Sequence, residues 1–181
     1  MTLASQDNQA VIFTIGHSNR PLAEFVSLLV ANAVQRVIDI RTIPRSRHNP
    51  QYEQAALATS LSAAGIHYSY FGGLGGLRKP RPDSENTGWR NRSFRAYADH
   101  MQSVEFQEAL NRLVAVAQEE RCTLMCAEAV PWRCHRSLVA DALLVRGFSV
   151  EDIIGTAPPR KHALTPFAHV MGTAITYPSL L

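Results

Sequence analysis

Thiols, a carboxylate, guanidiniums and an imidazole are concentrated in one short stretch of the chain. Cys126 and Glu128 follow an apolar run, and Arg133, Cys134 and His135 follow a Pro-Trp pair a few residues later. Thiols are nucleophiles, carboxylates and imidazoles exchange protons, and guanidiniums match the oxygens of phosphate and carboxylate groups. These residue types together predict a site for an anionic substrate.

A strand, a loop and a helix are expected to position these side chains. Residues 122–126 are apolar and bounded by charged residues, which is typical of a buried parallel strand. From Leu138 apolar residues recur at helical spacing until Gly147. Loops at the carboxyl ends of parallel strands are common ligand sites, because helix amino termini bring unpaired N–H groups there. The predicted site lies in such a loop.

The same alternation of strand and helix extends along the chain, which predicts a single three-layer α/β domain, Rossmann-like, with about five mainly parallel strands flanked by helices. We assign residues 1–9 to a flexible N-terminus, 10–170 to the domain and 171–181 to a C-terminal tail, with residues from 156 onwards irregular. The other expected strands are 10–15, 36–40, 67–71 and 149–154, and the other expected helices are 21–29, 51–64, 93–100 and 103–117.

Composition limits the class of protein. The chain has 181 residues, enough for one ordinary domain, and of its 18 basic residues only Lys79 and Lys161 are lysine. The arginine excess fits an anionic substrate, although a GC-rich genome explains it equally well. No signal peptide, membrane-length apolar run or paired cysteine pattern is evident, so we expect a cytoplasmic protein with reduced thiols and no membrane partner.

Polar or glycine residues follow each of the first four predicted strands. In a parallel sheet these loops share one rim, where several arginines would repel one another unless an anion lay among them. The predicted substrate-binding residues are Ser18, Asn19, Asp39, Arg41, Arg45, Gly75, Gly76, Arg78, Arg133 and Arg136. The predicted catalytic residues are Glu128, Cys126, Cys134, His17 and His135.

Simpler interpretations compete with these assignments. Either cysteine is alternatively an inert buried thiol, and Glu128 alternatively forms a salt bridge to a nearby arginine. Where the helix begins, the helix dipole and the flanking arginines would lower the pKa of the Cys134 thiol. Cys126 and Cys134 are also candidates for a redox pair, but their spacing is not C-x-x-C. With His135 and His17 they could form a zinc site, but the spacing of structural zinc sites is absent, so no metal ligand is assigned.

Two segments of the chain partly resemble motifs that bind phosphate or nucleotides. Cys126 and Arg133 are arranged somewhat like a phosphatase loop, but with six residues between them. The double-glycine segment, residues 72–78, permits close backbone approach to a ligand but matches neither the P-loop nor the dinucleotide fingerprint. The sequence therefore identifies no cofactor.

Four blocks of residues occur in a recognisable order along the chain. They are Thr14-Ile15-Gly16-His17-Ser18-Asn19, Asp39-Ile40-Arg41 with Pro44 and Ser46, Leu74-Gly75-Gly76 with Arg78, and Cys126-Ala127-Glu128 with Cys134-His135-Arg136. Together they resemble the signature of the domain of unknown function 488 family. The resemblance implies an α/β domain from bacteria or archaea with a polar cleft, and no activity. It also implies one site formed by Asp39, Arg41, Cys126, Glu128, Cys134, His135 and Arg136.

Three functions are consistent with these observations. The first is an enzyme, a hydrolase or transferase, acting on a phosphate-bearing metabolite or nucleic acid in a cleft at the carboxyl ends of the strands. The second is a non-catalytic nucleic-acid-binding module that uses the same arginines. The third is a thiol-redox or metal-binding protein. The sequence does not determine the substrate, the strand order or the oligomeric state.

Overall fold

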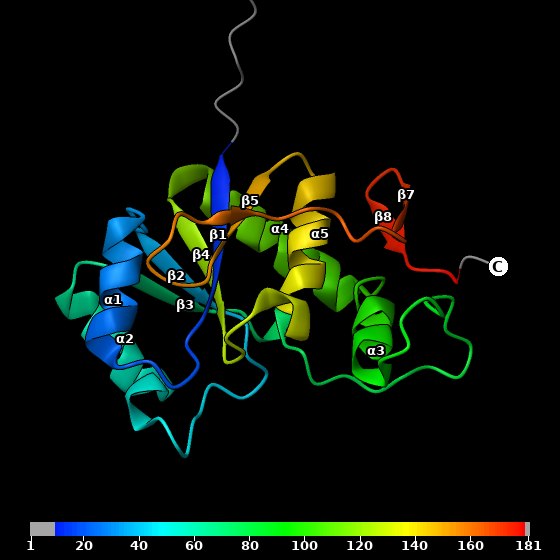
Figure 1. The fold of residues 1–181 in the computed structure, drawn as a ribbon. Helices are drawn as coiled ribbons and strands as arrows, with labels where there is room; N and C mark the ends of the chain where they lie inside the picture. Colours follow the sequence, from blue (N-terminus) through cyan, green and yellow to red (C-terminus); the bar gives the residue numbers. More distant parts are fainter. Residues whose placement is uncertain (1–9, 180–181) are drawn as a thin grey trace, which may run out of the picture.

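A six-stranded sheet forms the centre of the molecule (Figure 1). The computed structural model describes residues 10–179. The strand order is β3-β2-β4-β1-β5-β6, in which the first five strands pair in parallel and β6 pairs antiparallel with β5. The expected mainly parallel sheet is therefore confirmed, with one short strand added at its edge. The strands are β1 (Val11–Gly16), β2 (Arg36–Asp39), β3 (His67–Tyr70), β4 (Cys122–Cys126), β5 (Ser149–Ile153) and β6 (Arg160–Lys161).

Helices cover both faces of the sheet, which confirms the three-layer α/β class. Helices α1 and α2 pack in one apolar cluster, and α3, α4 and α5 pack in the other. Successive strand residues such as Ile12 and Phe13 belong to opposite clusters, because side chains alternate along a strand. The helices are α1 (Leu22–Ala31), α2 (Gln54–Ala63), α3 (Arg92–His100), α4 (Val104–Glu119) and α5 (Arg136–Val145), with short 3₁₀ turns η1 (Pro50–Tyr52), η2 (Gly72–Leu74) and η3 (Pro131–Arg133).

Local signals set several helix boundaries. The side-chain oxygen of Ser103 accepts a hydrogen bond from the backbone N–H of Phe106 and so caps α4, as the sequence predicts. Gly65 and Gly147 follow α2 and α5 with φ of 72° and 87°, a left-handed conformation in which glycine carries no steric cost. The expected helix over 51–64 is divided into η1 and α2, with Glu53 between them in an extended conformation.

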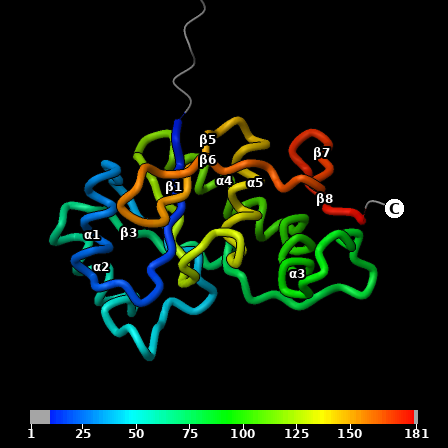
Figure 2. The backbone as a smooth tube through the Cα atoms, viewed as in Figure 1, coloured from blue at the N-terminus to red at the C-terminus, as the bar shows by residue number. Residues whose placement is uncertain are grey.

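The tail is more ordered than the sequence suggests. Where irregular chain was expected after residue 156, the structure has β6 and a hairpin of β7 (His169–Met171) and β8 (Ala174–Thr176). The segment runs past α5 to this hairpin (Figure 2), and Tyr177 beyond it is fully buried. The expected start of the tail at residue 171 therefore falls within β7, and the expected flexible N-terminus, residues 1–9, lies outside the described residues.

No membrane-spanning helix is found between residues 10 and 179, because none is both long and apolar enough.

Candidate functional site

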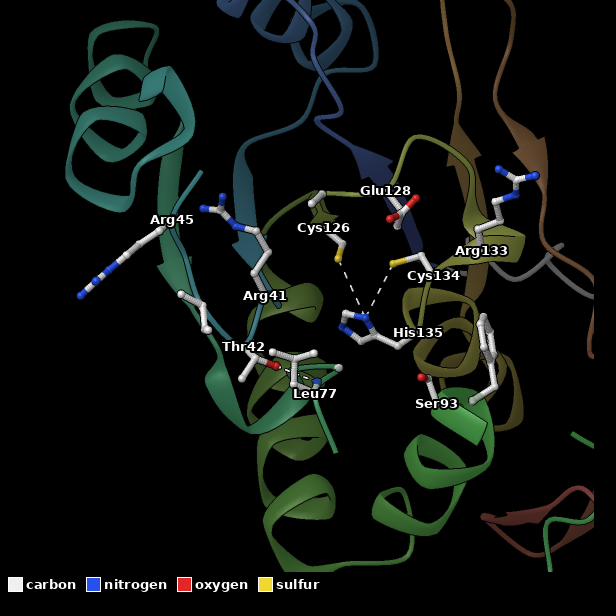
Figure 3. Close-up of a pocket in the computed structure, with 14 residues that line it drawn as sticks. Arg41, Thr42, Arg45, Leu77, Ser93, Cys126, Glu128, Arg133, Cys134 and His135 are labelled. Atoms are coloured by element: carbon white, nitrogen blue, oxygen red, sulfur yellow. Dashed lines mark hydrogen bonds between the residues drawn. The ribbon is translucent and has the colours of Figure 1, made fainter. Parts of the chain in front are cut away.

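A pocket of about 410 Å³ lies at the carboxyl ends of β2, β3 and β4 (Figure 3). Four segments line it: the loop after β2, the glycine segment after β3, the start of α3, and the loop that joins β4 to α5. The last of these is the stretch that carries the thiols. Because β4 lies between β1 and β2 in the sheet, its carboxyl end is central, and loops from both sides reach it.

The pocket contains some of the predicted site residues and not others. Those that line it are Arg41, Arg45, Gly76, Cys126, Glu128, Arg133, Cys134 and His135. Those that do not are His17, Ser18, Asn19, Asp39, Gly75, Arg78 and Arg136. The lining also includes residues that the sequence did not single out, namely Thr42, Ile43, Leu77, Ser93, Phe94 and Ala127.

Cys126, Cys134 and His135 form a cluster inside the pocket. The Nδ1 atom of His135 lies 3.9 Å from the sulfur of Cys126 and 3.7 Å from the sulfur of Cys134 (Figure 3). The other ring nitrogen, Nε2, lies 3.0 Å from the carbonyl oxygen of Ile40. Since a carbonyl only accepts hydrogen bonds, Nε2 carries a proton, and in the neutral imidazole the lone pair of Nδ1 therefore points at the two sulfurs.

The two thiols of this cluster are electrostatically unequal. A hydrogen bond between them raises the pKa of Cys126, which burial raises further, and lowers the pKa of Cys134. The guanidinium of Arg136 also lowers the pKa of Cys134, and the backbone N–H of Arg136 donates to the Cys134 sulfur at 3.5 Å. Cys134 is therefore the first of the pair to become a thiolate. The sequence attributed such a shift to the helix end and nearby arginines, whereas the neighbouring thiol contributes most.

Cys122, the third cysteine, lies at the opposite end of β4. It is fully buried in the apolar core, and burial raises the pKa of its thiol to about 12. Its sulfur donates to the carbonyl oxygen of Glu120. Cys122 is thus a core residue.

His17 is held away from the pocket by its own hydrogen bonds. Its Nδ1 donates to the carbonyl of Ser18 at 2.8 Å, its Nε2 lies 3.3 Å from the guanidinium of Arg41, and its ring stacks on Tyr52. Burial is the main cause of its lowered pKa. Because both ring nitrogens are occupied, His17 supports Arg41 and is not available to a molecule in the pocket.

Arg41 lines the pocket but its charge is balanced. Its guanidinium donates to both carboxylate oxygens of Asp39, at 2.9 and 2.6 Å, and both residues are buried. The hydroxyl of Tyr68 donates to the same carboxylate. This bidentate pair fixes the loop after β2 and leaves Arg41 with little net charge to offer an anion.

Arg136 and Arg78 hold backbone rather than facing the pocket. Arg136 is fully buried, and its guanidinium donates to the carbonyl oxygens of Glu128 and Ala129 at 2.6 and 3.1 Å. Arg78 donates to the carbonyl of Gly75 and pairs with a glutamate on α4. Of the five arginines predicted to bind substrate, Arg41, Arg78 and Arg136 are therefore engaged by the protein itself.

The free cations at the pocket are Arg45 and Arg133. Both are exposed, and neither forms an ion pair with any residue in the range 10–179. Figure 3 shows them on opposite sides of the sulfur and imidazole cluster, with their guanidiniums directed outward. They are long side chains at the edge of the pocket, where they can reach an anionic group.

Glu128 is the carboxylate of the pocket. It is exposed, and within the described part of the chain its carboxylate makes no ion pair, in contrast to the salt bridge considered from the sequence. Its backbone, not its side chain, contacts Arg136. Gly16 packs directly against this backbone, since a Cβ atom there would lie 1.7 Å from the Glu128 carbonyl oxygen. The loop is thus fixed while the carboxylate remains available.

Comparison with known proteins gives a family and no activity. A family model described as "Domain of unknown function DUF488" matches residues 21–143, more than half of the chain, and includes β2 to β4 and most of α5. Neither the curated proteins nor the solved structures gave a match.

Proposed function

The chain belongs to the DUF488 family, and since that family is described without an activity, we propose from the chemistry of the pocket that the protein is an enzyme. In this proposal it acts on an anionic substrate by hydrolysis or group transfer. Glu128 is the general base, and Arg45 and Arg133 bind the anionic group.

The observation that carries the proposal is the combination of free groups in one pocket. Among residues 10–179, the carboxylate of Glu128 and the guanidiniums of Arg45 and Arg133 form no ion pair, and all three line the same pocket beside an imidazole and two thiols. A general base must reach the nucleophile, and a clamp must reach the charge of the substrate, so both need side chains that the fold itself leaves unneutralised.

The rest of the lining suits a small organic anion. Ile43, Leu77 and Phe94 provide apolar surface, and Thr42 and Ser93 provide hydroxyl groups. A volume of about 410 Å³ is within the usual range for small-molecule sites, which combine apolar walls with a few polar groups. A phosphate-bearing metabolite, or the end of a nucleic acid, has this composition.

The proposal is favoured over simple nucleic-acid binding by Glu128. A module that only binds phosphate gains nothing from an unpaired carboxylate in its binding pocket, because the two anions repel. A general base, in contrast, must lie in the pocket, because it accepts a proton from the nucleophile there. The cluster of thiols and imidazole beside it is likewise unnecessary for binding alone.

Replacing Glu128 by glutamine tests the catalytic part. We expect turnover to fall at least about a hundredfold, because the amide cannot accept the proton, while affinity is kept. The wild type and the variant would be assayed against phosphomonoesters, phosphodiesters and carboxylate-bearing esters and amides. Glu108→Gln, an exposed position on α4, is the matched control and should retain full activity. Equal turnover by Glu128→Gln would disprove the assignment.

Replacing Arg45 and Arg133 by glutamine tests the anionic substrate. Each change should weaken binding of inorganic phosphate by about tenfold, since each removes one charge-assisted contact. Isothermal titration at two salt concentrations would measure it, with Arg121→Gln as a control on a distant exposed arginine. Unchanged phosphate affinity in the double variant would contradict the clamp. Strongly salt-dependent binding of oligonucleotides without any turnover would favour the binding module instead.

A further inference from the structure

We propose that Cys126, Cys134 and His135 bind one transition-metal ion of the zinc class, with a fourth position open to the pocket. The inference rests on the proposed function, because it identifies the nucleophile that Glu128 would activate. The ligand atoms of these three side chains all lie within 4.8 Å of one another, close enough to hold one ion. Among residues 10–179, no other group of His, Cys, Asp and Glu side chains meets this condition.

The orientation of His135 is the first argument. Its Nε2–H donates to the carbonyl of Ile40, so Nδ1 is the nitrogen that is free of a proton in the neutral ring, and it faces both sulfurs. Histidine ligands typically donate the opposite ring N–H to a backbone carbonyl or a carboxylate, and this fixes the tautomer and the direction of the lone pair. The ring is therefore already in the state that a metal ion requires.

The distances are the second argument. A tetrahedral Zn²⁺ ion about 2.3 Å from sulfur and about 2.1 Å from nitrogen places a sulfur about 3.6 Å from the nitrogen and the two sulfurs about 3.8 Å apart. The sulfur to Nδ1 distances are 3.9 and 3.7 Å, and the two sulfurs lie within 4.8 Å of each other. Both sulfur to nitrogen distances are therefore within a few tenths of an ångström of the tetrahedral value.

The packing around the ring is the third argument. A Cβ atom on Gly76 would lie 2.4 Å from Nδ1 of His135, so only a glycine fits there. The ring of Tyr97 packs against the same imidazole, with centroids 4.9 Å apart. The backbone N–H of Arg136 donates to the sulfur of Cys134, an interaction that stabilises a thiolate ligand. The donors are therefore held in place before any ion arrives.

The number of ligands indicates a catalytic rather than a structural ion. Structural zinc sites are closed by four protein ligands, whereas catalytic sites have three and keep a position for water or substrate. His17, considered from the sequence as a fourth ligand, is turned toward Ser18 and Arg41. The fourth position is left to water on the side of the pocket, where Glu128 also lies.

This arrangement assigns hydrolysis as the reaction. The ion would supply Lewis-acid polarisation of a water, and Glu128 would accept the proton of that water as its oxygen forms a bond to the electrophilic carbon or phosphorus of the substrate. The bond to the leaving group then breaks, and Glu128 returns the proton to that group. One water is added across one bond, and no electron donor or acceptor takes part.

The experiment measures metal binding by the protein itself. The full chain, purified with a phosphine reductant and without chelator, would be analysed for metal by mass spectrometry. The metal-free protein would then be titrated with Co²⁺ alone and with Zn²⁺ alone. We expect about one ion per chain and thiolate-to-cobalt charge-transfer bands, which Zn²⁺ abolishes.

Variants localise the ion. Cys126→Ser, Cys134→Ser and His135→Gln should each weaken Co²⁺ binding at least about a hundredfold, since loss of a supporting residue alone costs up to that much. Cys122→Ser is the control for a buried thiol outside the cluster and should bind as wild type. Gly76→Ala should weaken binding by displacing the imidazole, whereas Gly155→Ala, with no atom near its Cβ position, should not. Circular dichroism would show which variants fold. Gly76→Ala and Gly155→Ala keep all three ligands, so they test the site even if a ligand variant fails to fold.

The outcomes separate this inference from the proposed function. The metal site is disproved if the folded wild type shows no cobalt bands and instead contains a reactive Cys134 thiolate or a Cys126–Cys134 disulfide. If Glu128→Gln still abolishes turnover in that case, the enzyme proposal stands with a thiol nucleophile. If the ion binds but no substrate is turned over, the metal site stands and the proposed function fails.

Discussion

Replacing Arg136 by methionine is expected to lower the free energy of unfolding by about 3–5 kcal/mol. The guanidinium is fully buried and donates to the carbonyls of Glu128 and Ala129 and to the hydroxyl of Thr14. Methionine fills much of the volume but donates no hydrogen bond, so two loop carbonyls and the buried Thr14 hydroxyl lose their donor. The loop that carries Glu128 loses its main support, and activity should fall with stability.

Urea unfolding monitored by fluorescence would measure the change. Arg92→Met is the matched control, because Arg92 is an exposed residue at the start of α3, and its substitution should change stability by no more than about 0.5 kcal/mol. Arg136→Lys should have an intermediate free energy of unfolding, because one ammonium group cannot form all the hydrogen bonds of the planar guanidinium. If Arg136→Met unfolds at the same urea concentration as Arg92→Met, the buried guanidinium does not support the loop.

The architecture could be predicted because its signal is local. β1 and β4 are short apolar or β-branched runs. The boundaries of all five parallel strands deviate from the prediction by one residue at most. The cap at Ser103 and the glycines after two helices depend on neighbouring residues only. The β7–β8 hairpin was missed because its strands are three residues each and mostly exposed, so they carry no apolar alternation.

The site could be predicted only at the level of the loops. Parallel strands bring their carboxyl ends to one edge, so the loops after β2 and β4 were expected to meet, and Arg41, Glu128 and Cys134 do line one pocket. What each side chain does there depends on contacts that form only once the loops are folded. Arg41 is neutralised two residues away by Asp39, but Arg136 is engaged by carbonyls that only the folded loop supplies.

Ser93 and Phe94 show a different limit of sequence reasoning. They reach the pocket because the segment between Leu77 and α3 returns the chain to it, and this segment carries no strand or helix. Its course depends on contacts such as the buried Asn86, whose amide donates to Asp99 and whose carbonyl accepts from the backbone of Tyr177. No periodic signal could place it.

The tail is fixed to the domain by a buried charge cluster, and this cluster makes stability depend on pH. His162 lies between Asp141 of α5 and Asp152 of β5, at 2.9 and 3.6 Å. Tyr177 donates to the first carboxylate and Thr14 to the second. Burial lowers the pKa of His162, but the hydrogen bonds and charges of the two carboxylates outweigh it and raise this pKa from 6.5 to about 9. The folded protein therefore holds the proton more tightly than the unfolded chain does.

A raised pKa stabilises the fold only while the imidazole is protonated. The contribution, about 3 kcal/mol for a shift of this size, is fully present below pH 6.5 and is lost as the pH rises through about 9. His162→Gln should therefore be less stable than wild type by about 3 kcal/mol at pH 6, with a difference that shrinks toward pH 9.5. Urea unfolding across this range would measure it, with the exposed His169→Gln as control. If the stability curves of the wild type and His162→Gln remain parallel from pH 6 to pH 9.5, the imidazole is not the charge that balances Asp141 and Asp152.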